Sequence, residues 1–455
     1  MNILKKLFAI SLAIVLVLTV AGCGGNGKGN TDNDGFVKES TIKLPDLKID
    51  SDKVYYLTWD DPSNLTTPSA YMYTINEKLK QEYGVSIEYI RTLNTEIDIK
   101  AAQLVLSGNS PDMIAIRERD YPNFALKGIA QPWEPYMDFS EPVFEGIKEV
   151  NDKFRINGDV YRYFNTFVNN GMTWYWVNDF TELGLKTPRE LYYDGEWTWS
   201  KLEEYAKLLT VKDSTGTVAK YGVGYEYDMH VVTGETYVKR NSDGSYSNNL
   251  SSSKLADWFN YSTRLGFEEK VRPVGTHTWD LFKQGKVSML VYTQNYGGNH
   301  MQSELLAGDV DFAPSPKWDN ADKYYAPATG FGAWLAKGAK NPEEATAFMA
   351  IWRLCSGKID PVVIEAQKKR DEILAGWDEE DHAIYDEMND PSKFEFIISM
   401  DDGMGTTWGT ADRSVFQKDV FWYNKSWAST VQKYTPVLNS AINEHKKAMS
   451  DFLNK

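Results

Sequence analysis

The order of secondary-structure patterns between Lys53 and Ile116 constrains the fold of this chain more than any other feature. The β-type run KVYYLTW ends at a polar turn, and a helical pattern from Tyr71 follows it and stops at Gly84. The alternating run VSIEYI indicates a second strand, EIDIKAAQLVLSG a second helix, and PDMIAI a third, buried strand. Strand–helix–strand–helix–strand at this spacing predicts an α/β fold built on a parallel, doubly wound sheet.

Such sheets bind ligands outside the carboxyl ends of their strands. Two polar loops therefore become candidates for a binding site, WDDPSN after the first strand and RERDY after the third. Later in the chain, ETYVKRNSDGSYSNNL predicts a β-hairpin, and Ser253 to Leu265 a helix. An amphipathic stretch from Thr430 to Leu453 predicts a C-terminal helix that needs no role beyond packing.

The first 23 residues are typical of a secretion signal that ends in a lipid anchor. Lys5 and Lys6 precede the 14-residue apolar run LFAISLAIVLVLTV, which is shorter than the ~20 residues of a membrane span. The sequence VAGC after it resembles the lipobox of bacterial lipoproteins. That resemblance implies a signal peptide of residues 1–22 and an acylated Cys23 that holds the protein on the outer face of the cell membrane. The following GGNGKGNTDNDGFVKES is nearly free of apolar residues, so residues 23–50 are expected to form the anchor and a flexible tether.

Charge and length restrict the class of protein. About 415 residues follow the stretch GGNGKGNTDNDGFVKES, more than one hydrophobic core usually covers, so two or more domains are expected. The formal net charge is −15, and it becomes −17 once Lys5 and Lys6 leave with the signal. Such an acidic surface argues against binding nucleic acid or anionic lipid.

Catalytic and metal-binding patterns are missing from the sequence. There is no Gly-x-Ser-x-Gly elbow, no phosphate-binding Gly-Lys-Ser/Thr loop and no His-Glu-x-x-His pair, and the five histidines are scattered singly. Cys355 follows an apolar helix and is expected to be a buried thiol. The acidic pairs Asp60/Asp61, Glu118/Asp120 and Glu226/Asp228 could serve a glycoside hydrolase. The alternative, that these acids accept hydrogen bonds from sugar hydroxyls or are only solvated, is preferred, so we expect no enzyme, no metal and no cofactor.

Several segments, in order and spacing, match one known family. GNSPDMIAI, NGDVYRY with MTWYWVNDFTELGLKTP, WDLFKQGKVSMLVYTQNY, DFAPSPKW and GFGAWLAKGAKNPEEATAFMAIW together resemble the extracellular solute-binding proteins of family 1. This is the maltodextrin-binding type that feeds ABC sugar importers. The insertion RELYYDGEW interrupts the pattern, and residues 355–400 have no counterpart in it.

The resemblance implies two α/β lobes, each a mostly parallel sheet flanked by helices, joined by three hinge crossings. The first lobe would comprise residues 51–168 plus about 319–360, and the second residues 169–318 plus about 361–455. It also implies a monomer that closes around a carbohydrate, an oligosaccharide in the first instance, and delivers it to the membrane subunits of an ABC permease. A lipid-anchored sensor or adhesin, or a receptor for a solute other than a sugar, remains the alternative.

Sugars present apolar faces that stack on aromatic rings and hydroxyls that need directional polar partners. The loops expected to face the inter-lobe cleft offer both kinds of group. The predicted ligand-binding residues are Trp59, Asp60, Asp61, Arg117, Glu118 and Asp120 from the first lobe, Asn169 and Asn170 from the crossing, and Tyr225, Tyr227, Asn295, Tyr296 and Trp408 from the second lobe.

Two further tryptophans lie at the start of a predicted helix, in GEWTWSKLEEYAKLLT. Thr198 stands at the cap position, and Trp199 shares one helical face with Leu202, Tyr205, Ala206 and Leu209. Trp199 is therefore expected to pack inward. Trp197 precedes the cap and could either staple the helix or face the cleft, with the structural role favoured.

Overall fold

The computed structural model describes residues 40–67, 70–117, 120–225, 227–241, 245–293, 300–399 and 412–454. For residues 227, 228, 374 and 412–415 it describes the backbone alone. The predicted signal peptide, Cys23 and the beginning of the predicted tether lie outside these ranges.

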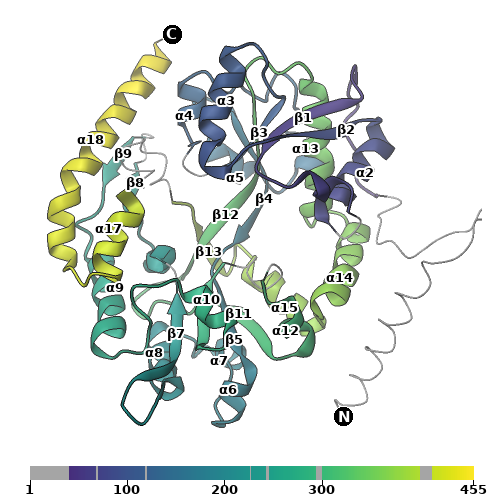
Figure 1. The fold of residues 1–455 in the computed structure, drawn as a ribbon. Helices are drawn as coiled ribbons and strands as arrows, with labels where there is room; N and C mark the ends of the chain where they lie inside the picture. The colour runs from purple at the N-terminus through teal and green to yellow at the C-terminus, as the bar shows by residue number, and fades with distance from the viewer. Residues whose placement is uncertain are drawn as a thin grey trace, which may run out of the picture. The chain divides into compact units, whose positions relative to one another are not determined.

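A mixed sheet follows the alternation predicted from the sequence (Figure 1). Its strands lie in the order β13–β12–β3–β1–β2, with β4 also paired to β12. The strands are β1 (Lys53–Thr58), β2 (Ser86–Arg91), β3 (Met113–Ala115), β4 (Arg162–Asn169), β12 (Tyr324–Leu335) and β13 (Phe394–Ile397). Strands β1, β2 and β3 are parallel, whereas β12 runs antiparallel to β3 and β4. The α/β prediction is confirmed.

Helices flank this sheet. They are α2 (Tyr71–Tyr83), α3 (Ile97–Leu106), α4 (Asn123–Leu126), α5 (Lys148–Asp152) and α13 (Pro342–Ser356). Gly84 ends α2 in the left-handed conformation, with φ 70°, as the predicted stop requires. Helix α13 packs against α2, β1 and β4, and all but two of its residues are buried.

A second mixed sheet has the order β11–β5–β10–β7–β6. Its strands are β5 (Met172–Trp176), β6 (Val211–Lys212), β7 (Val218–Tyr225), β10 (Val287–Tyr292) and β11 (Val310–Pro314). Only β7 and β10 are paired in parallel, with Tyr225 opposite Val291, so the expectation of a mostly parallel sheet is wrong for this sheet. The predicted hairpin is the separate pair β8 (Val238–Arg240) and β9 (Tyr246–Asn248). The accompanying helices are α6 (Val177–Thr181), α7 (Pro188–Tyr193), α8 (Trp199–Leu209), α9 (Ser253–Thr263), α10 (Thr278–Lys283), α12 (Gln302–Ala307), α17 (Asp412–Phe421) and α18 (Trp427–Leu453).

Buried apolar side chains form two separate clusters. The first core cluster draws on residues from Val54 to Phe164 and from Ala333 to Val363. The second draws on residues from Met172 to Ala326 and from Ile384 to Ile442. The segment without a counterpart in the family pattern forms α14 (Pro361–Ala375), α15 (Glu379–Met388) and β13, and β13 pairs in parallel with the beginning of β12.

The two tryptophans of the GEWTW stretch belong to the second cluster. Thr198 caps α8 by accepting a hydrogen bond from the amide of Lys201 (3.2 Å). All five residues of the predicted apolar face, beginning with Trp199, are buried. Trp197 is buried as well, and its indole N–H donates to the Pro314 carbonyl (2.9 Å). Both tryptophans therefore support the fold.

The predicted tether is too long. Composition assigned residues 23–50 to the anchor and tether, but backbone amides from Thr41 onward are bonded to the buried carboxylates of Asp360 and Glu344. Apolar side chains within the segment, Ile42, Leu44, Leu47 and Ile49, also pack on that cluster. Their spacing among polar residues hid this contact from the composition-based argument.

Candidate functional site

The carboxyl ends of β1, β2 and β3 form one edge of the first sheet, and the predicted loops meet there. The amide of Thr92, after β2, donates to the carbonyl of Thr58 at the end of β1 (3.0 Å). Trp59 and Asp60 follow directly and are partly exposed. Asp60 accepts a hydrogen bond from the Thr58 hydroxyl (3.0 Å). Asp61 is exposed, and one of its oxygens caps the next turn through the amide of Ser63.

The charge of the Asp60 carboxylate acts on two nearby tyrosines, Tyr56 and Tyr89. Burial raises the pKa of Asp60, and its bond from Thr58 opposes that shift. Burial also raises the pKa of Tyr89, with a further contribution from the charge of Asp60. The ring of Tyr89 contacts that of Tyr56 edge-on, with centroids 5.9 Å apart. This corner holds an acceptor and phenol groups that stay protonated at neutral pH, a set suited to hydroxyl-bearing ligands.

Arg117 lies at the same edge, but its positive charge is paired with carboxylates of the protein itself. The side chain is 5% exposed and forms a two-point pair with Asp120, Nε to Oδ2 at 2.8 Å and Nη2 to Oδ1 at 2.6 Å. It also pairs with Asp98 (3.0 Å) and donates to the Asn94 carbonyl. Since β1 lies between β3 and β2, this side chain crosses the end of β1 to join the two neighbouring loops.

The assignment of Arg117 and Asp120 as direct ligand contacts is therefore corrected. Both side chains are buried and paired with each other, so they position the loops rather than reach a ligand. Glu118, between them, lies outside the described residues.

The crossing residues differ from each other. Asn169 is fully buried: its amide and side-chain nitrogen donate to Asn389 (2.9 Å) and Met388 (3.0 Å), and its side-chain oxygen accepts from Gly171 (2.8 Å). Its predicted ligand role is wrong, because these structural bonds occupy the side chain. Asn170 is partly exposed, and its backbone amide donates to the Pro327 carbonyl.

Tyr225 belongs to the second core cluster and is 3% exposed. Its ring lies 5.5 Å from each of Trp199 and Trp258, and its hydroxyl donates to Ser262 (2.9 Å). The prediction that Tyr225 touches ligand is wrong, because the side chain is buried and its ring and hydroxyl are used in contacts within the core. The side chain of Tyr227 and the residues Asn295, Tyr296 and Trp408 lie outside what the structure describes.

The structure reveals an aromatic row that the sequence argument did not assign. His277 stacks on Trp279 with centroids 4.3 Å apart, and Trp279 stacks on Tyr292 at 5.6 Å. Trp422 contacts His277 edge-on at 5.7 Å. All four rings are partly exposed. Trp279 is the second residue position after His277 and begins the segment WDLFKQGKVSML, which is part of the family resemblance. Its place in that segment could have indicated a role in the site.

This aromatic row lies at the carboxyl edge of the parallel pair β7/β10. Tyr292 is the last residue of β10, and Trp279 is in the first turn of α10. Gly224, next to the end of β7, lies so close to Thr278 that an added Cβ would approach its Cβ to 2.7 Å. The absence of a side chain there lets α10 begin at this edge. The predicted residues Asn295 and Tyr296 follow Tyr292 by only a few positions.

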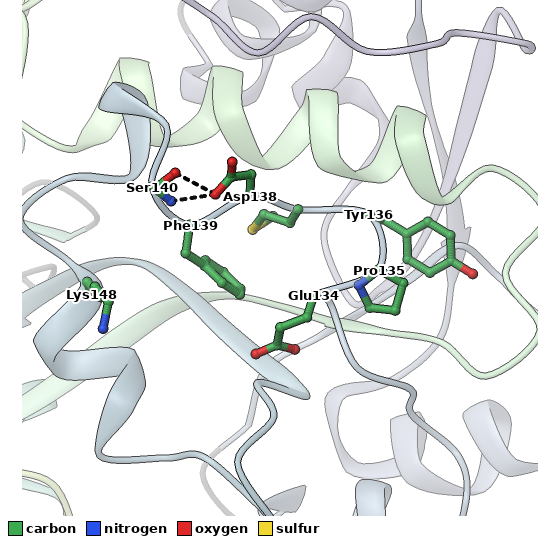
Figure 2. Close-up of a pocket in the computed structure, with 8 residues that line it drawn as sticks. Glu134, Pro135, Tyr136, Asp138, Phe139, Ser140 and Lys148 are labelled. Atoms are coloured by element: carbon green, nitrogen blue, oxygen red, sulfur yellow. Dashed lines mark hydrogen bonds between the residues drawn. The ribbon is translucent and has the colours of Figure 1, made fainter.

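A surface hollow of the first lobe lies elsewhere (Figure 2). It is lined by residues 134–140 and Lys148 and contains none of the predicted site residues. Its carboxylates bond within the protein: Asp138 accepts from the amide and hydroxyl of Ser140, and Glu134 accepts from Arg155 and from the amide of Val160. Thr346, near the start of α13, bonds to the Tyr136 carbonyl, which places the hollow toward the amino ends of the strands.

Three general features complete the site description. In the ranges that the structure covers, no three or more His, Cys, Asp or Glu side chains are arranged to hold a metal ion. Among the same residues, no helix combines the length and apolar character needed to cross a membrane. Cys355 is buried, and burial raises the pKa of its thiol to about 12.

The sequence profile of the family described as bacterial extracellular solute-binding protein matches residues 62–352. The chain belongs to this family. The resemblance found in the motifs is thereby confirmed, and the protein is a binding protein rather than an enzyme, placed outside the cytoplasm. No curated protein sequence matches this solute-binding protein.

Solved structures share its two-lobed fold. An ABC substrate-binding protein from Listeria monocytogenes in complex with cycloalternan aligns with a TM-score of 0.62 and 16% identity, covering 88% of this chain and 99% of that one. A Staphylococcus aureus extracellular solute-binding protein in complex with maltose gives 0.62 and 13%, with coverages of 87% and 99%. The maltose/maltodextrin-binding domain from Bdellovibrio bacteriovorus bound to maltotriose gives 0.52 and 17%, with coverages of 89% and 100%.

Proposed function

We propose that this solute-binding protein captures a carbohydrate between its two lobes and delivers it to the membrane subunits of an ABC importer. An oligosaccharide is the preferred ligand. The observation that carries the proposal is the partly exposed row His277–Trp279–Tyr292 at the carboxyl edge of β7 and β10. Flat aromatic surfaces of this kind match the apolar faces of sugar rings. The sugar complexes of the three structural neighbours support the same ligand class.

The first lobe would supply the polar half of the site. Asp60 offers an acceptor beside the Tyr89 phenol, and Trp59 a partly exposed ring. Arg117 is neutralised by Asp98 and Asp120, so it adds no net attraction for an anionic ligand. This arrangement favours a neutral polyol over a sugar phosphate or a uronate. The other predicted contacts in this proposal are Asp61, Glu118, Asn170, Tyr227, Asn295, Tyr296 and Trp408.

The lobes would follow the boundaries given by the family resemblance, residues 51–168 with about 319–360 and residues 169–318 with about 361–455. The separation into two core clusters supports this division. Ligand binding would shift the population from an open to a closed arrangement, which a permease would recognise. Acylation of Cys23 would hold the protein, as a monomer, at the cell membrane.

A thermal-shift screen tests the proposal. Protein beginning at Asp32 is heated with a panel of neutral oligosaccharides, their uronate counterparts and non-sugar solutes, and any ligand that raises the melting temperature is measured by calorimetry. The expected result is a rise with a neutral glycan and no product formed. Stabilisation only by uronates, or by a solute other than a sugar, would overturn the ligand assignment.

A further inference from the structure

The segment Ser40–Ser51, which we call the anchor strap, is bonded to the first lobe at both of its ends. At its beginning, the Asp360 carboxylate accepts from the Ser40 hydroxyl (2.5 Å) and the Thr41 amide (2.7 Å). At its end, the Glu344 carboxylate accepts from the amides of Asp50 (2.8 Å) and Ser51 (2.6 Å). Between these bonds its apolar side chains join the first core cluster, and the Tyr83 hydroxyl donates to the Pro45 carbonyl (2.8 Å).

The two carboxylates that bind the anchor strap are unusually buried for acidic residues. Asp360 is fully buried and Glu344 is 2% exposed. Carboxylates are rarely buried unless several donors compensate the loss of water. Here the strap supplies those donors to both. Glu344 lies in the first turn of α13 and Asp360 shortly after its end, so the strap runs the length of this helix.

Asp360 has a second role. Its other oxygen accepts from the Val362 amide (2.8 Å) and caps α14, the helix that leaves the first core cluster. One buried side chain thus connects the strap to the start of a segment that leads toward the second cluster, whose next member is Ile384.

We propose that the anchor strap is a built part of the first lobe, locked by Asp360 and Glu344, and that it makes this lobe the one to which the lipid anchor is attached. Only the residues before Ser40 then remain as the tether. The strap itself follows from the contacts above, whereas its connection to a membrane rests on the proposed acylation of Cys23.

Hydrogen exchange on the protein beginning at Asp32 tests the lock. We expect Asp360→Asn and Ser40→Ala each to speed exchange of the Thr41 and Ile42 amides at least tenfold, and Glu344→Gln to do so at Asp50 and Ser51. Ser40→Ala leaves the α14 cap intact, so it separates loss of the lock from unfolding of the helix. Asp378→Asn is the matched control, because Asp378 caps α15 and contacts no strap residue.

Unchanged protection at Thr41 and Ile42 in both variants would overturn the strap proposal, whatever sugar the protein binds. A mass of the membrane-extracted protein that lacks a lipid on Cys23 would instead overturn the anchoring half. Failure of the ligand screen would leave both results untouched, so the three outcomes are distinguishable.

Discussion

The Asp112 carboxylate accepts a hydrogen bond from the backbone amide of Asn341, 2.9 Å away, although 229 positions separate the two residues. The same side chain accepts from the amides of Lys340 (3.0 Å) and Tyr55 (2.8 Å). It therefore joins the start of β3, the middle of β1 and the approach to α13. Asp112 stands in the segment GNSPDMIAI of the family resemblance, and this junction gives its carboxylate a structural role.

Replacing Asp112 should destabilise the protein without altering the residues of the proposed binding site. Asp112→Ala leaves several buried donors without an acceptor, each worth about 1–3 kcal/mol. We expect the free energy of unfolding, measured in urea, to fall by about 3 kcal/mol or more. Asp138→Ala is the control, since Asp138 bonds only to nearby Ser140 at the surface. A loss no larger than that of the control would contradict the role given to Asp112.

The aromatic row should contribute directly to ligand affinity. We expect Trp279→Ala to weaken binding of the sugar found by the screen by about 1–3 kcal/mol, because a stacking surface is lost. Trp59→Ala on the first lobe, and Tyr296→Ala on sequence grounds, should weaken it by a similar amount. Calorimetry measures each affinity. If Trp279→Ala binds as tightly as the wild type, the row lies outside the site.

Tyr225→Phe distinguishes a core residue from a ligand contact. The substitution removes the hydroxyl that donates to the buried Ser262 and leaves the ring in place. We expect the free energy of unfolding to fall by about 1 kcal/mol and the sugar affinity to stay unchanged. A selective loss of affinity at unchanged stability would return Tyr225 to the binding site.

Acid should destabilise the fold through His445. Burial lowers the pKa of this histidine from 6.5 to about 4, against the ring of Tyr246 at 4.8 Å. Because the unfolded chain binds the proton more readily, stability falls as the pH drops from about 6.5 to about 4. At 1.36 kcal/mol per pKa unit the full effect is about 3 kcal/mol. Urea unfolding at pH 7 and pH 4 measures it.

The variant His445→Gln isolates that contribution from the many carboxylates that also titrate. Its stability is expected to decrease less than that of the wild type between the two pH values. Equal decreases would show that His445 is protonated in the folded protein at no penalty.

Local patterns in the amino-acid sequence predicted the order of several helices and strands. Apolar spacing gave β1, α2, β2, α3 and β3, and Thr198 with its helical face identified α8 and the burial of Trp199. These features depend on residues within a few positions of one another, and their periodicity is visible in one dimension. The motif order likewise identified the family.

Tertiary structure alone decided which candidate side chains are available to a ligand. Arg117 and Asp120 satisfy each other, the Asn169 amide is taken by Asn389, 220 positions away, and Tyr225 is enclosed by Trp199 and Trp258. The contact of Trp422 with His277 and the docking of Ser40 on Asp360 also join distant segments. Residue type states what a side chain can bind, but the partner it binds depends on which distant segment the fold brings beside it.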